Sequence, residues 1–280
     1  MDGIRIVSDS TCNLPQELVE RYHITIVPVN IQLGGKSYLE GIEITPELFY
    51  RELEAGAAAS TSQPSPGQFV AVYQSLLEEA SAIISIHVTA KSSGTYQSAM
   101  MAREMMPGAD ITVVDSASIS MGTGFQVLAA ARAVEEGKDK GEILALVERI
   151  KARVNIYATV ATLKYLQQSG RVGRLQSALA SMLDVKPVVT IVDGALEMVE
   201  KVRTRSRALE RVLALTTEAS GQGRRAKVAV LHAQVPQEGE WLREQVEQRI
   251  ECQELFFLEA ALSLAVHGGP GVIGIISYRV

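Results

Sequence analysis

Residues 83–100 read IISIHVTAKSSGTYQSAM, and this stretch decides the fold class. It begins with a short run rich in isoleucine, Ile83–Val88, which is typical of a strand buried on both faces. A turn at Ser92-Ser93-Gly94 follows and opens a helical segment. Three more apolar runs are predicted as strands: Ile4–Val7, Ile24–Val29 and Ile111–Val114. Strands that alternate with helices predict an α/β fold with a parallel sheet and flanking helices.

The second half of the chain has a less regular pattern. Asp193-Gly194 separates two β-rich runs and predicts a hairpin. The candidate strands are Ile156–Thr162, Pro187–Val192, Ala195–Val202, Ala226–Leu231, Glu254–Leu258 and Val272–Tyr278. We therefore expect two α/β domains. Residues 1–151 form a domain with a parallel sheet, and residues 152–280 form one with a mixed or antiparallel sheet and helices.

The composition narrows the class of protein. The chain has 280 residues, of which 47% are hydrophobic and 21% charged, which predicts a packed globular protein. Its 27 basic and 32 acidic residues give a net charge of −5, which argues against generic nucleic-acid binding. Cys12 and Cys252 lie far apart without metal-ligand spacing, as expected in the reducing cytoplasm. We expect neither a signal peptide nor a membrane span.

Small polar residues follow the predicted parallel strands, where open α/β sheets bind ligands. These segments are Ser8-Asp9-Ser10-Thr11, His87-Val88-Thr89 and Asp115-Ser116. His87 ends its strand, so we expect it to face this edge. The turn at Ser92 and Ser93 has two interpretations. It is either an ordinary helix cap, or a site where backbone N–H groups and a hydroxyl bind an anion.

Three further segments also leave two interpretations open. The hydroxyl-rich stretch 60–66 is either a surface loop before a helix or a cover over a ligand. His267, which precedes the glycines of 268–271, is either a solvated turn residue or a ligand contact. A basic cluster is either a solvated face or a docking point for phosphate or an acidic partner. It consists of Arg171, Arg174, Lys201, Arg203, Arg205 and Arg207.

Several catalytic and cofactor motifs are incomplete. Gly34-Gly35-Lys36-Ser37 lacks the first glycine of a phosphate-binding loop, and Gly122-Thr123-Gly124 lacks the third glycine of a dinucleotide fingerprint. Polar groups without an obvious reactive group favour a binding protein. One alternative is an acyl hydrolase with Ser93 or Thr61 as nucleophile and His267 as base. A dinucleotide-binding regulatory domain is the other.

Taken together, the segments resemble the DegV family of bacterial fatty-acid-binding proteins over nearly the whole chain. The matching N-terminal segments are Val7–Thr11 with Leu14-Pro15, Val27–Val29, Gly35–Tyr38, Thr61–Pro66, Ser92–Ala99 and Val114–Ser116. The matching C-terminal segments are Leu163–Val172, Lys186-Pro187, Lys201–Thr204 and His267–Gly271. The resemblance implies a long-chain fatty acid, such as palmitate or stearate, buried between two α/β domains.

The resemblance also implies roles for individual residues. Thr61, Ser93 and His267 would bind the fatty-acid carboxylate, with Ser62, Ser92 and Gly94 as neighbours. Arg171 and Arg203 would dock a fatty acid kinase, which makes an acyl phosphate from the bound acid. The chain itself would be a lipid-binding protein rather than an enzyme, with no catalytic residue, metal or cofactor of its own.

Overall fold

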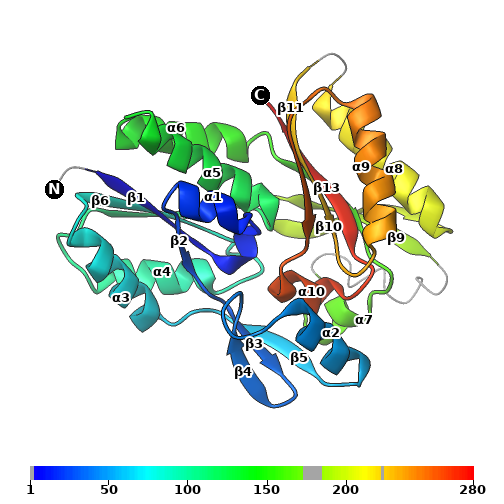
Figure 1. Cartoon of the computed structure of the whole chain (residues 1–280), viewed down its shortest axis with the longest axis horizontal. Coiled ribbons are helices and arrows are strands. Elements are labelled where there is room, and N and C mark those ends of the chain that lie inside the picture. The colour runs from blue at the N-terminus through cyan, green and yellow to red at the C-terminus, as the bar shows by residue number, and fades with distance from the viewer. Residues whose placement is uncertain (1–2, 173–184, 222–223) are drawn as a thin grey trace. The chain divides into compact units, whose positions relative to one another are not determined.

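The computed structural model describes residues 3–172, 185–221 and 224–280. Its contacts divide the chain into two compact units (Figure 1). The first comprises Met1–Ala152 and the short segment Ala261–Ser263, and the second comprises Arg153–Ala260 and Leu264–Val280. Each unit has its own sheet and its own core.

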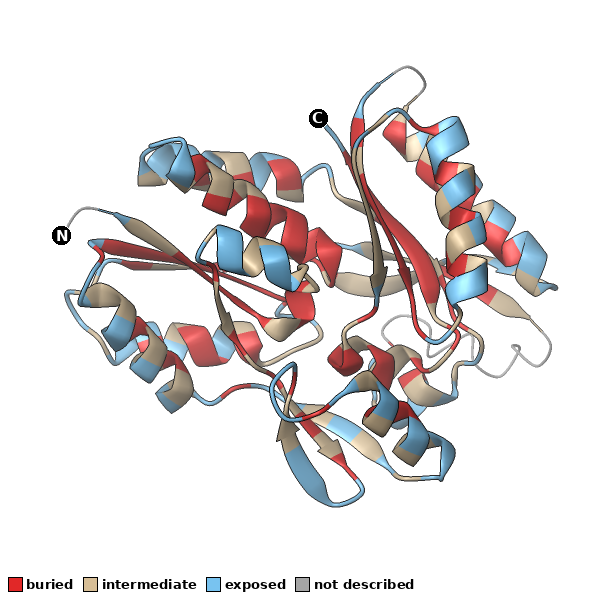
Figure 2. Cartoon of the chain, in the orientation of Figure 1, coloured by how far each residue is buried: buried red, intermediate tan, exposed pale blue. Residues whose placement is uncertain are grey.

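A parallel sheet forms the centre of the first unit, with strand order β2-β1-β6-β7. Its strands are β1 (Ile4–Asp9), β2 (Thr25–Val27), β6 (Ala82–His87) and β7 (Ile111–Asp115). The predicted parallel sheet is confirmed. The run predicted as Ile24–Val29 gives a shorter strand that ends before Pro28, because proline has no N–H for the ladder. Every residue of β6 is buried (Figure 2), as its run of isoleucines predicts.

Helices cover both faces of this sheet. The helices of this unit are the 3₁₀ turn η1 (Ser10–Cys12), α1 (Gln16–Arg21), α2 (Pro46–Glu54), α3 (Pro66–Leu77), α4 (Thr95–Glu104), α5 (Met121–Glu135) and α6 (Lys140–Lys151). Ile84 and Ile86 pack with α5 and α6 on one face, and Ile83 packs with α3 and α4 on the other. Gly124 lets α5 approach η1, because a Cβ there would lie 2.5 Å from the Cys12 carbonyl oxygen. Close packing therefore explains Gly124 in the segment Gly122-Thr123-Gly124.

A small antiparallel sheet in the same unit was not predicted from the sequence. It consists of β3 (Asn30–Leu33), β4 (Lys36–Leu39) and β5 (Ala59–Ser62), in the order β4-β3-β5. Gly34 and Gly35 have φ of +57° and +81° and form the hairpin turn between β3 and β4. The stretch 60–66 is therefore no plain loop, because its first residues pair with β3 as a strand.

The second unit contains a mixed sheet in the order β10-β9-β8-β13-β11-β12, as predicted. All neighbouring strands are antiparallel except β11 and β12. Its strands are β8 (Asn155–Thr159), β9 (Lys186–Val192), β10 (Ala195–Val202), β11 (Ala226–His232), β12 (Cys252–Glu259) and β13 (Ile273–Arg279). Asp193 and Gly194 form the predicted hairpin turn, with φ of +49° and +78°. In β10 the register shifts between Met198 and Glu200, so Val199 bulges.

Two long helices pack against this mixed sheet. They are α8 (Arg205–Ser220) and α9 (Pro236–Arg249), and the shorter helices are α7 (Lys164–Gln168) and α10 (Leu262–Gly268). Leu213 of α8 and Leu242 of α9 belong to one buried cluster with Val228 and Val230 of β11 and Ile275 of β13. The second core is thus built from sheet and helix residues of the second unit.

Candidate functional site

The carboxyl ends of β1 and β6 are joined by a buried pair, Asp9 and His87. Asp9 Oδ2 lies 2.9 Å from His87 Nδ1 and accepts the Val88 backbone N–H at 3.1 Å. Asp9 Oδ1 accepts the backbone N–H and the hydroxyl of Thr11. Neither side chain of the pair is exposed to solvent. Four hydrogen bonds therefore compensate a carboxylate that burial would otherwise destabilise.

His87 continues this network inward, so the expectation that it faces the ligand-binding edge is wrong. Its Nε2 lies 2.6 Å from Ser85 Oγ, which also accepts the Tyr73 hydroxyl at 2.8 Å. Burial raises the pKa of Tyr73 to about 12, so this phenol stays a donor. The Ser85 hydroxyl proton is then available for His87 Nε2, and in that arrangement the ring N–H of His87 lies on Nδ1 and faces Asp9.

The row Ser85–His87–Asp9 has the order of a hydrolase triad but not its accessibility. Ser85, His87 and Asp9 are all completely buried, and Tyr73 shares the Ser85 hydroxyl. A nucleophilic serine needs space beside its Oγ for the reacting carbonyl. The buried row therefore lacks the space that a nucleophilic serine needs, and its hydrogen bonds join strands β1 and β6.

Hydrogen bonds connect the turn that carries Ser92 and Ser93 to the buried Asp9–His87 pair. Val88 is held by Asp9, Thr89 N–H donates to the Ser118 carbonyl at 2.9 Å, and the N–H groups of Ser92 and Ser93 donate to the Thr89 carbonyl at 3.2 Å. Ser93 Oγ lies 2.8 Å from the Thr95 hydroxyl and accepts the Thr95 N–H. The helix α4 begins after Gly94 without a side-chain cap at that residue.

The second hydroxyl segment lies next to this turn. In β5, Thr61 pairs with Ile31 and is half-buried, while Ser62 is exposed. Gln63 follows, and its amide group lies against Gly94, where an added Cβ would be 2.9 Å from Gln63 Cδ and Nε2. The structure thus brings the segment of Thr61 and Ser62 beside the turn that ends at Gly94.

His267 belongs to the second unit and is the last residue but one of α10. Burial lowers the pKa of His267 to about 4, and the positive charge of Arg171 contributes in the same direction. At neutral pH the imidazole is therefore neutral and can donate one hydrogen bond. Gly269 has φ of +76° and packs on the ring of Tyr165. The convergence of His267 with the hydroxyls of the first unit stays a prediction.

Sequence reasoning missed two side chains, the buried Glu40 and the half-buried Asn13, that hold the segment 261–263 within the first unit. Glu40 Oε1 accepts the Ser263 N–H at 2.7 Å, and its other oxygen accepts the Ser10 hydroxyl. Burial raises the pKa of Glu40 above the ordinary value. Asn13 Oδ1 accepts the Ala261 N–H at 2.7 Å. These partners are 223 and 248 residues apart, so no local sequence signal identifies them.

The basic cluster of the sequence lies in the second unit. Arg205 is paired with Glu238, while Arg171 donates to the Ser169 carbonyl at 2.6 Å. Lys201, Arg203 and Arg207 line a surface groove, and Arg174 lies outside the described residues. The basic cluster thus divides into two groups. Arg171 and Arg205 are hydrogen-bonded to neighbouring residues, while Lys201, Arg203 and Arg207 line one groove.

The described residues form neither a metal centre nor a membrane-spanning helix. Within residues 3–172, 185–221 and 224–280, no three His, Cys, Asp or Glu side chains are grouped as metal ligands. No helix in the described part of the chain has the length and apolarity needed to cross a bilayer. Cys12 is a free, buried thiol whose pKa burial raises to about 12, so it is a poor nucleophile.

Comparisons with known proteins match the whole chain. The model of the DegV family, described as an uncharacterised protein family, matches residues 3–280. A DegV domain-containing protein of Caldanaerobacter subterraneus is 34% identical over 275 residues, covering 98% of each chain. A solved structure from Thermus thermophilus, described as fatty acid binding of a DegV family protein, has a TM-score of 0.94 and 36% identity, covering 99% of this chain and 100% of that one. DegV of Bacillus subtilis, described as a fatty acid binding protein, has a TM-score of 0.92 and 30% identity, with both chains fully covered.

Proposed function

Because the chain belongs to the DegV family, we propose that it binds one long-chain fatty acid in a buried tunnel, with the carboxylate held by Thr61, Ser93 and His267. Ser62, Ser92 and Gly94 are the neighbouring residues of this anchor. The observation that carries the proposal is the likeness over the whole chain to two solved proteins that are described as fatty acid binding. The adjacency of Gln63 and Gly94 supports it, since it brings the two hydroxyl segments together.

The energetics of such a site are favourable. Burying about 14 methylene groups contributes roughly 11 kcal/mol, at about 0.8 kcal/mol each. An unpaired carboxylate would cancel much of this gain. Each hydrogen bond to the charged group returns about 1.5–3 kcal/mol, so a few hydroxyl and amide donors suffice. Neutral His267 fits this anchor because it adds a donor without adding a charge.

We also propose what happens to the bound acid. The chain presents the carboxylate to a fatty acid kinase in the cytoplasm, and Arg171 and Arg203 contact that partner. The kinase makes the acyl phosphate, so this chain needs no catalytic residue and no cofactor of its own. The alternative of an acyl hydrolase, with Ser93 or Thr61 as nucleophile and His267 as base, gains no support from the described residues. The Ser93 hydroxyl bonds to the Thr95 hydroxyl, and the separate row of Ser85, His87 and Asp9 is completely buried.

The bound lipid itself provides the test. Purified protein is denatured and analysed by mass spectrometry, and we expect one fatty acid per chain. Protein stripped of lipid is then titrated with palmitate and stearate. A chain that carries no fatty acid and takes up neither added acid would refute the proposal.

A further inference from the structure

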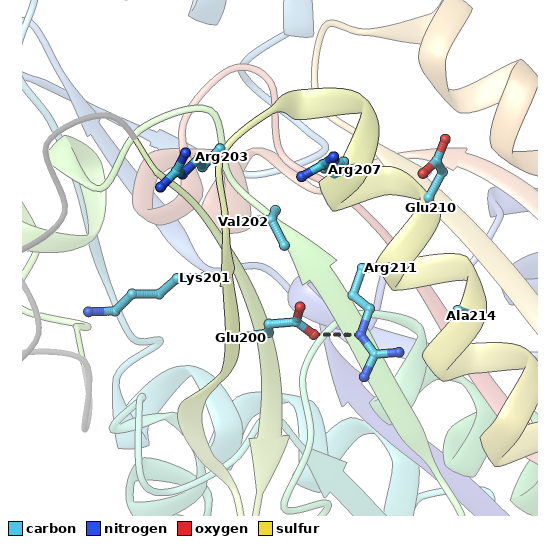
Figure 3. A pocket seen from close by; sticks show the side chains of 8 residues that line it. All are labelled: Glu200, Lys201, Val202, Arg203, Arg207, Glu210, Arg211 and Ala214. Carbon is cyan, nitrogen blue, oxygen red and sulfur yellow. Dashed lines mark hydrogen bonds and ion pairs between the residues drawn. The ribbon is translucent and has the colours of Figure 1, made fainter.

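A groove in the second unit lies between the end of β10 and the first turns of α8, far along the chain from the hydroxyl segments. It has a volume of about 610 Å³. It is lined by Glu200, Lys201, Val202, Arg203, Arg207, Glu210, Arg211 and Ala214 (Figure 3). Glu210, Arg211 and Ala214 lie three, four and seven positions after Arg207 in α8, so the four residues share one face of the helix. Small Ala214 keeps that face open.

The charges that line this groove do not balance. Four of the lining residues are basic and two are acidic, so they sum to +2 in a chain of net charge −5. Arg211 Nε donates to Glu200 Oε2 at 2.5 Å, which neutralises one pair across the groove (Figure 3). Neither Arg203 nor Arg207 has a carboxylate partner among the described residues. Two guanidinium groups therefore remain for an anion from outside.

The start of α8 adds to this positive field. The helix has 16 residues, begins after Thr204 and carries no acidic residue in its first turn. Its positive dipole end is therefore left uncompensated by an acidic side chain of that turn. The neighbouring Arg205 is already paired with Glu238 and takes no part. Arginines gathered at a positive helix end repel one another, and a bound anion removes that repulsion.

We propose that this groove binds the phosphate group of a small molecule. A phosphate dianion neutralises two guanidinium groups, whereas a single carboxylate neutralises one. The planar fork of arginine fits phosphate oxygens in a bidentate manner. The volume falls in the range of small-molecule sites, which fits a free phosphate ion or a phosphorylated metabolite such as a nucleotide. The proposal does not depend on fatty-acid binding.

The first test uses the chain alone, so that the proposed kinase contact of Arg203 has no influence. Calorimetric titrations at low ionic strength compare inorganic phosphate with ATP in the absence of divalent cations. The double variant Arg203→Gln/Arg207→Gln should bind at least tenfold more weakly than the parent chain. Arg149→Gln, an exposed arginine of α6, is the matched control and should bind as the parent chain does.

Each outcome of these titrations decides something. Tighter binding of ATP identifies a nucleotide-like ligand, and equal or tighter binding of inorganic phosphate identifies the phosphate group alone. The proposal is overturned if the parent chain binds neither compound, or if the double variant binds as the parent does. Urea unfolding and fatty-acid content are measured on the same samples, so loss of the fold or of the lipid is recognised separately.

A second variant should strengthen binding. Glu200→Gln removes a negative charge from the groove and releases Arg211 from its ion pair. We expect phosphate affinity to rise severalfold, because a third guanidinium becomes available. A general loss of structure lowers affinity and never raises it, so this result separates a built site from a folding effect. Unchanged affinity would place the anion outside the groove.

Discussion

Ser93 is the hydroxyl whose removal gives the clearest test of the carboxylate anchor. We expect Ser93→Ala to weaken fatty-acid binding by about 1–3 kcal/mol, because a charged acceptor loses a donor. Titration of lipid-free protein with palmitate measures this change. Ser75→Ala, at an exposed position of α3, is the control and should leave the dissociation constant unchanged. Equal affinities for both variants would mean that the carboxylate lies elsewhere.

Glu40 gives the first unit a stability that depends on pH. Burial raises the pKa of Glu40 in the folded chain above its value in the unfolded chain. The contribution of this carboxyl group to the free energy of unfolding is therefore complete below the ordinary pKa, and it is lost as pH rises through the raised pKa. Glu40→Gln keeps an acceptor for the Ser263 N–H but has no charge to lose. The free energy of unfolding of the variant, minus that of the parent chain, should therefore become more positive from pH 4 to pH 8.

Urea unfolding at several pH values measures this difference. Glu17→Gln, at an exposed position in the first turn of α1, is the control and should show a nearly constant difference. A constant difference for Glu40→Gln as well would show that the buried carboxyl titrates at its ordinary pKa.

Asp9 is expected to be the most sensitive buried polar residue of the parallel sheet. Asp9→Ala leaves the buried donors of Thr11, His87 and Val88 without their acceptor. We expect a loss of about 3–5 kcal/mol in the free energy of unfolding, as for other broken buried pairs. Denaturant unfolding checks this value, and a loss below about 1 kcal/mol would contradict the described network.

At the scale of elements, the glycine turn after α10 allows a test by close packing. A Cβ on Gly269 would lie 2.1 Å from Tyr165 Cδ2, and φ is +76°. Gly269→Ala should therefore cost about 2–4 kcal/mol, from overpacking and from backbone strain together. Gly137 has φ of +75° with open space around it, so Gly137→Ala should lose only about 1–2 kcal/mol. Thermal unfolding compares the two, and equal losses would contradict the contact with Tyr165.

The sequence predicted the buried strands well and the exposed strands poorly. Runs of isoleucine and valine marked the central strands, because those strands are covered on both faces and need apolar residues throughout. The strands β3, β4 and β5 are short and half-exposed, so they lack such a run. Only their pairing across the chain defines them, and pairing is a non-local property.

The candidate site was predictable to a similar extent. The turn at Ser92 and Ser93 and the capping box at Ser65 follow local rules, and the structure has both. The burial of His87 was not predictable, because its partner Asp9 is 78 residues away. Whether Thr61, Ser93 and His267 bind one carboxylate stays a prediction.

At the scale of the whole molecule, a bound fatty acid should stabilise the fold by mass action. Free ligand at 100 times its dissociation constant contributes about 2.7 kcal/mol. Calorimetry of lipid-free and palmitate-loaded protein should therefore show a higher unfolding temperature for the loaded form. Hexadecane, which lacks a carboxylate, is the control ligand and should stabilise less. Equal stabilisation by both compounds would show that the polar anchor contributes nothing.

The bulge at Val199 has a consequence for how copies of this chain behave at high concentration. Among the described strands, β10 lies at one end of its sheet, where an outer row of backbone groups is a template for another strand. The shift of register at Val199 interrupts the regular spacing of backbone groups that pairing with another strand requires. Charged Glu200 and Lys201, next along the same strand, add a further obstacle to a second copy. The bulge in β10 thus opposes the growth of fibres by strand pairing along this edge of the sheet.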